Sequence, residues 1–178
     1  MLIAQQKLKE NIAEYILYMW RVEDVVRALK LDIEAIRTSV ILPQAKDEEA
    51  LEAMVSWYTN LVKQMKLQGI TKEGHLSETE EKIQELNFLH FTLLQNLKDE
   101  AYMTHTESIQ EDLQQFKEKS EMMINSDVEV CLHALNMKLL LKLQKKEISK
   151  ETEEAFAKFA KLLAMLSAKY KAQFEVVN

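Results

Sequence analysis

The chain has 178 residues, a net charge of −6 and 47% hydrophobic residues. This composition argues against a disordered chain and against a membrane protein, and its length suits one domain with a buried core, over residues 1–178. Only two Gly and one Pro are present, whereas folds of many strands need numerous turn residues. The sequence therefore predicts an all-α, single-domain bundle of about five to seven helices.

The first helix is expected from about Ile3 to Leu29, where apolar residues recur at helical spacing. Its apolar surface extends beyond one stripe through Leu17, Trp20 and Val25. Two arrangements are open for such a helix: it is the central helix, with Trp20 covered by the C-terminal helices, or it meets a second copy of the chain. The second arrangement predicts a homodimer with Leu17, Trp20 and Val25 at its interface.

The next segments contain clear helix boundaries. Asp32 is expected to cap a short helix that ends near Ile41, before the break that Pro43 enforces. Asp47 begins a second long helix, and Gly69 stands where the end of that helix needs a left-handed residue. The segment GITKEGH that starts at Gly69 is the clearest loop of the sequence.

The middle of the chain is expected to hold a helix, a break and a more polar helix. Ser77 and Glu80 form an S-x-x-E capping box at the start of the first of these helices. A kink or short break is predicted between Asp99 and Thr106.

The C-terminal third predicts two helices joined by a short turn, KKEIS. Ser126 and Glu129 form a second capping box, which opens a Leu-rich helix. Ser149 caps the last helix, whose apolar stripe runs from Phe156 to Phe174.

Several stretches resemble one known family. IAQQKLKENIAEYILYMWRVEDVVRA near the start, and SDVEVCLHALNMKLLLKLQKKEISKETEEA and LLAMLSAKY toward the end, are similar to an uncharacterised family of bacterial all-helical proteins of about this length, a domain of unknown function. The similarity extends over the whole chain. It implies a single helical domain and brings no catalytic or binding residue with it.

Glu23 is a carboxylate on the apolar side of the first predicted helix, where an unpaired buried charge would be very costly. Arg27 follows one turn later, in the favourable order for an i,i+4 pair. We expect a structural Glu23–Arg27 pair. The alternative makes Glu23 a metal ligand or a general base.

The histidines do not follow the pattern of a di-iron helical bundle, which requires Glu-x-x-His motifs. The residues three places before the four histidines are Lys72, Asn87, Tyr102 and Val130. Glu129 and His133 have i,i+4 spacing, which alone is weak evidence for a metal site. His90 lies on an apolar face, where we expect a hydrogen-bonded core histidine. No metal or cofactor is expected, and no catalytic residue is assigned.

Nucleic-acid binding is disfavoured because the chain has no Arg after residue 37, and Arg is the preferred residue for forked recognition of phosphate and guanine. One helix-turn-helix alternative uses residues 126–178. The lysines that would meet phosphates there are Lys158, Lys161, Lys169 and Lys171.

Three functional hypotheses follow. The first is a non-catalytic, cytoplasmic bundle that serves as an interaction or scaffolding protein for an unidentified protein partner. The second is an enzyme with an unfamiliar acid/His site that uses Glu23 or His90, and the third is DNA binding. The cytoplasmic location, without membrane contact, is expected because no signal-peptide core and no apolar run of about 18 residues is present.

Overall fold

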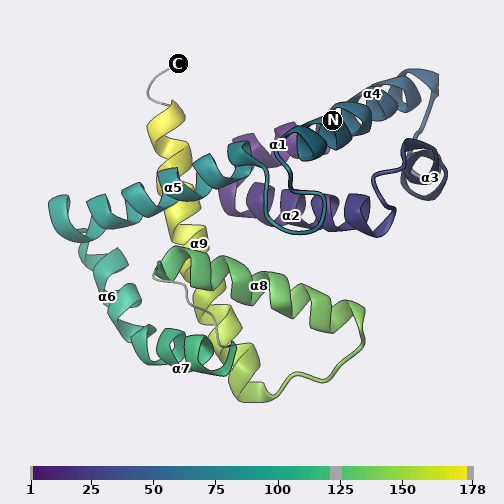
Figure 1. Ribbon diagram of the computed structural model, residues 1–178. Helices are drawn as coiled ribbons and strands as arrows, with labels where there is room; N and C mark the ends of the chain where they lie inside the picture. Colours follow the sequence, from purple (N-terminus) through teal and green to yellow (C-terminus); the bar gives the residue numbers. More distant parts are fainter. Residues whose placement is uncertain (1, 121–125, 176–178) are drawn as a thin grey trace.

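Every element in the described part of the chain is helical (Figure 1). The structure is a computed structural model that describes residues 2–120 and 126–175. The nine α-helices within that part are α1 (Leu2–Glu10), α2 (Ile12–Ala28), α3 (Ile33–Ile36), α4 (Glu48–Leu67), α5 (Ser77–Phe91), α6 (Glu100–Ser108), α7 (Gln110–Ser120), α8 (Asp127–Leu143) and α9 (Lys150–Glu175). Two π-helical turns, η1 (Arg37–Ile41) and η2 (Thr92–Asn96), extend α3 and α5. The Phe174 side chain lies outside the described part.

The helix α2 is the central element of the fold. It packs against α1, α5, α8 and α9, which explains why its apolar surface is wider than one stripe. The long helix α9 crosses α2, α5, α6 and α8 (Figure 1). Its inward side chains Phe156 and Phe159 are completely buried. Side chains from both ends of the chain therefore meet in one apolar core, while the single-domain organisation stays a prediction.

The number of helices exceeds the predicted five to seven because segments that look continuous in the sequence are divided in the structure. Asn11 has an extended backbone with φ −156°, and its Oδ1 accepts the Glu14 N–H at 3.1 Å. This cap separates α1 from α2 within the expected helix Ile3–Leu29. Similarly, the backbone at Ile109 interrupts the helical path between α6 and α7.

The expected break between Asp99 and Thr106 is misplaced. The chain turns just before Asp99, where Lys98 adopts a φ of 48°. Asp99 then caps α6 by accepting the Tyr102 N–H at 3.0 Å, and α6 continues without interruption through Thr106.

Most predicted helix starts are confirmed by side-chain caps. Asp47 accepts the Ala50 N–H at 2.8 Å, Ser126 accepts the Glu129 N–H at 3.3 Å, and Ser149 accepts the Thr152 N–H at 3.2 Å. Asp32 caps α3 in the same way. None of the helices in residues 2–120 and 126–175 combines the length and the apolar composition that a bilayer crossing requires.

The cap at Asp47 generates a stability prediction. Asp47→Ala removes the only side-chain acceptor that caps α4 among the described residues, and we expect the free energy of unfolding to fall by about 1 kcal/mol. Glu52→Ala, at an exposed position inside the same helix, is the matched control. Urea unfolding of both variants measures the difference, and equal stabilities would contradict the assigned cap.

Candidate functional site

Glu23 is completely buried and binds the segment that leads into α5. Its Oε2 lies 2.7 Å from Nδ1 of His75, and its Oε1 accepts the Leu76 N–H at 3.1 Å. Nδ1 of His75 and the Leu76 N–H are therefore the two groups within hydrogen-bond distance of this carboxyl group. Both carboxyl oxygens of Glu23 thus contact residues that are distant in the sequence.

Arg27 lies closer to the loop of residues 69–75, which precedes α5, than to the Glu23 carboxylate. Its Nη2 lies 3.7 Å from the Glu23 carboxylate, whereas its Nε donates to the Ile70 carbonyl at 3.3 Å and its Nη2 donates to the Gly74 carbonyl. Gly74 has a φ of +88°, and an added Cβ would lie 3.1 Å from the Ile70 side chain. The loop therefore needs glycine where its carbonyl meets Arg27.

The predicted capping box at Ser77 and Glu80 is wrong, because side chains from other helices cap α5. Ser77 is the first helical residue, and the cap position is Leu76, whose side chain accepts no hydrogen bond. Glu23 accepts the Leu76 N–H, and Oε1 of Gln68 accepts the Ser77 N–H at 2.8 Å. The negative charge of Glu23 also lies at the positive end of the α5 dipole.

Trp20 lies beside this cluster, between histidines from two other segments. Its ring centroid is 4.5 Å from that of His75, at 18° between planes, and 4.8 Å from that of His133 on α8. Of the three residues expected at a dimer interface, Leu17 is 7% exposed, Trp20 1% and Val25 41%. The structure thus has the first of the two arrangements for this helix, with α8 over Trp20, and only Val25 remains accessible to a second copy.

The other candidate polar residues have separate local partners. The Glu129 carboxylate accepts the Asn87 side-chain N–H at 2.9 Å, while His133 packs on Trp20. His90 Nδ1 lies 2.6 Å from the Tyr102 hydroxyl, and burial lowers the pKa of His90. Among the described residues, no group of three or more His, Cys, Asp and Glu side chains is placed to hold a metal ion.

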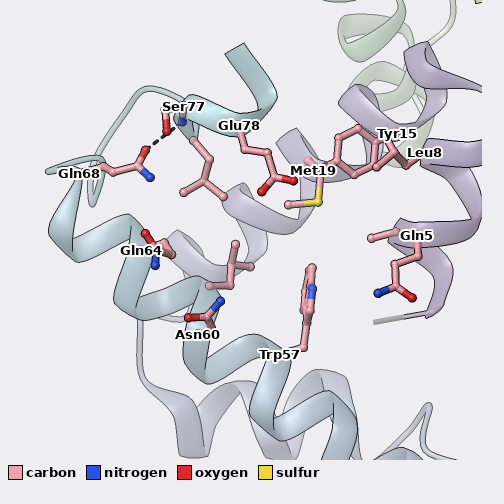
Figure 2. Close-up of a pocket in the computed structure, with 13 residues that line it drawn as sticks. Gln5, Leu8, Tyr15, Met19, Trp57, Asn60, Gln64, Gln68, Ser77 and Glu78 are labelled. Carbon is pink, nitrogen blue, oxygen red and sulfur yellow. Dashed lines mark hydrogen bonds between the residues drawn. The ribbon is translucent and has the colours of Figure 1, made fainter. Parts of the chain in front are cut away.

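A pocket of about 420 Å³ lies between α1, α2, α4 and the start of α5 (Figure 2). We call it the carboxamide pocket because it is lined by Asn60 and Gln64 of α4 and by Gln68, which directly follows α4, together with Trp57 one turn before Asn60. Leu8, Met19, Leu61 and Leu76 also line it, although Met19, Leu61 and Leu76 are almost completely buried. The side chains of Asn60 and Gln64 make no hydrogen bond to any residue in the described part of the chain.

Tyr15 and Glu78 are the ionisable groups that line the carboxamide pocket. Burial, followed by the nearby charge of Glu78, raises the pKa of Tyr15 to about 12. The hydroxyl therefore stays protonated at neutral pH. Glu78 belongs to the first turn of α5, so the contacts of Glu23 with the preceding residues also position this wall of the pocket.

The structure brings together residues that sequence analysis did not connect. The sequence predicts a Glu23–Arg27 pair, but His75 and Leu76 are the closer partners of Glu23. In the sequence, the pocket residues Asn60 and Gln64 have the pattern of ordinary solvent-exposed helix residues. The available signal was their i,i+4 spacing beside Trp57.

A protein-family model matches residues 1–175, and its description is Domain of unknown function (DUF4924). The chain belongs to this family. No curated protein and no solved structure matches the chain.

The contacts of Glu23 predict that a conservative substitution at this position lowers the stability of the fold. Glu23→Gln keeps the shape but removes the buried charge, and we expect a loss of about 1.5–3 kcal/mol in unfolding free energy, as for hydrogen bonds to charged groups. Asp24→Asn is the control, because Asp24 also binds Arg27, at 2.9 Å, but is half exposed. That change should cost less than about 1 kcal/mol. Similar losses in urea unfolding would contradict the assignment.

A pH dependence follows from His133. Burial and then the neighbouring His75 lower its pKa below the usual 6.5. At a pH below the usual pKa of 6.5, His133 binds a proton in the unfolded chain but not in the folded chain. The free energy of unfolding is therefore highest above that pKa and falls as the pH decreases. The slope is at most about 1.4 kcal/mol per pH unit for one site. His133→Phe keeps a ring against Trp20 and should reduce this slope between pH 7 and 5. An unchanged slope would show that His133 does not titrate in this way.

Proposed function

We propose that this member of the family is a non-catalytic binding protein that recognises a partner through the carboxamide pocket. The supporting observation is the combination of Asn60 and Gln64, whose polar groups have no partner among the described residues, with Trp57 in one pocket. Ligand pockets typically contain a few polar groups that fix the orientation of the ligand, and have volumes of about 300–1,000 Å³.

The chemistry of the pocket favours binding over catalysis. Carboxamide side chains do not titrate, so they cannot act as general acids or bases near neutral pH. Tyr15 stays protonated at neutral pH because its pKa is about 12. A scaffolding or interaction role needs no more than recognition, which these groups supply.

An acid–base enzyme is the second candidate, and the Glu23–His75 pair is the observation that favours it. His75 lines a second depression of about 730 Å³, together with Ile70 and the exposed Phe88. A carboxylate that orients an imidazole is a common catalytic arrangement. We rank it second because both Glu23 oxygens hold the segment before α5, a sufficient structural reason for the pair.

Nucleic-acid binding by α8 and α9 ranks last. Lys158 pairs with Asp112 at 2.7 Å, and Lys169 pairs with Asp99. Two of the four lysines proposed to meet phosphates are thus neutralised by α7 and by the start of α6. Phosphate contacts there would first have to break these pairs.

Affinity capture from an extract of the native cells tests the proposed function. Asn60→Trp places a large ring at the mouth of the carboxamide pocket, and we expect recovery of the specific partner to fall by about tenfold or more, which corresponds to about 1.4 kcal/mol. Thr59→Trp is the matched control, since Thr59 is the adjacent exposed residue of α4 and does not line the pocket. Equal recovery with wild type and Asn60→Trp would contradict the proposal.

A further inference from the structure

The outward side of α5 is acidic and aromatic. With about 100° between successive residues of a helix, Glu81, Gln84, Phe88 and Phe91 share one side of α5, and all four are exposed. Phe88 is 71% exposed, and Phe91, its neighbour three residues later, is 57% exposed. Glu80 lies beside this stripe, and neither Glu80 nor Glu81 forms an ion pair with a described residue. We call these five residues the α5 surface.

Most of the α5 surface lines the second depression, which has a volume of about 730 Å³. Ile70 and Phe88 supply apolar side chains to its lining, while Glu80 and Glu81 supply carboxylates. A complementary ligand therefore presents an apolar side chain with positive charge next to it.

The end of α8 has the opposite character. Leu140 and Leu143 lie in its last turn and are 41% and 73% exposed. Neither belongs to the apolar core of its own chain. Lys145 and Lys146 follow within three residues, are exposed, and form no ion pair within the described part of the chain. We call these four residues the α8 surface, which presents apolar side chains beside ammonium groups.

The two surfaces are complementary but far apart in one molecule. In Figure 1, α5 ends at the left side of the molecule, whereas α8 ends at the right side. A contact between them therefore requires two molecules.

We infer that the α5 surface of one copy binds the α8 surface of a second copy, with Leu143 in the depression beside Phe88 and the lysines next to the carboxylates. This contact differs from the interface expected on the first predicted helix, where Leu17 and Trp20 are buried. It goes beyond the proposed function, because it requires neither the carboxamide pocket nor a partner of that pocket.

Charge complementarity is the reason to assign a second copy to the α5 surface. The chain has a net charge of −6, so the acidic α5 surface repels most of the surface of another copy. Residues 138–150 are the exception, since they contain five lysines and one acidic residue. Burial of the apolar side chains supplies affinity, and the opposite charges fix the register of the contact.

Sedimentation velocity of the full-length protein tests this inference. Between about 10 μM and about 1 mM, where small interfaces associate, the mass should rise above that of one chain, 20.8 kDa. Phe88→Gln and Leu143→Gln should each weaken association by about tenfold or more, because each removes a large apolar side chain from the contact. Glutamine is a good helix former, and circular dichroism verifies that both variants fold. Leu42→Gln is the matched control, because Leu42 is exposed outside both surfaces.

A mixture of the two variants shows whether different surfaces meet. Phe88→Gln keeps the α8 surface, and Leu143→Gln keeps the α5 surface. Each variant alone should be monomeric at concentrations where the wild type associates, whereas an equimolar mixture should form a pair with one molecule of each. A mixture that stays monomeric, or association of either variant alone at the wild-type level, would overturn the inference.

Salt supplies an independent measurement. An increase in sodium chloride from about 50 mM to about 500 mM screens the charges and should weaken association several-fold, whereas a purely apolar contact lacks this dependence. A wild type that is monomeric throughout the range, or association that salt leaves unchanged, would overturn the inference. If that monomer bound phosphatidylserine vesicles through Leu143, an anionic membrane would be the ligand of the α8 surface instead. The proposed function would stand in either case, because none of these measurements involves the carboxamide pocket.

Discussion

The fold depends on the burial of one negative charge, that of Glu23. A carboxylate without solvent contact is stable only when hydrogen-bond donors replace the lost water. Here the donors are Nδ1 of His75 at 2.7 Å and the Leu76 N–H at 3.1 Å, with Arg27 close by. Since these donors precede α5, the charge of Glu23 connects the central helix α2 to the start of α5.

This connection has consequences on two sides of α2. On one side, it places His75 against Trp20, which His133 of α8 also contacts. On the other side, it positions Leu76 and Glu78, which line the carboxamide pocket. The buried Glu23 carboxylate therefore contributes both to the packing of α8 on α2 and to the shape of the proposed binding site.

Local features were predictable from the sequence, and contacts between distant segments were not. The caps at Asp47 and Ser149 depend on hydrogen bonds within a few residues, so their sequence signals are sufficient. Glu23 was recognisable as anomalous from its helical position, but its partner His75 lies 52 residues away, and no local pattern connects them. The Ser77 capping box failed for the same reason: the Ser77 N–H, which Glu80 would accept in such a box, is accepted here by Gln68. The sequence does not distinguish Asn60 and Gln64 from other solvated residues, because the pocket that they line depends on the positions of α1 and α5 in the folded chain.

Amide hydrogen exchange in the full-length protein tests the central role of Glu23 most directly. In Glu23→Gln, we expect faster exchange at residues 70–80, and especially at the Leu76 amide, because its acceptor loses charge and the loop loses its contact with that charge. The amides of α9 should keep their protection, and Asp24→Asn should behave like the wild type. Unchanged protection of Leu76 in Glu23→Gln, or an equal loss throughout α9, would contradict the claim that this buried carboxylate organises the segment before α5.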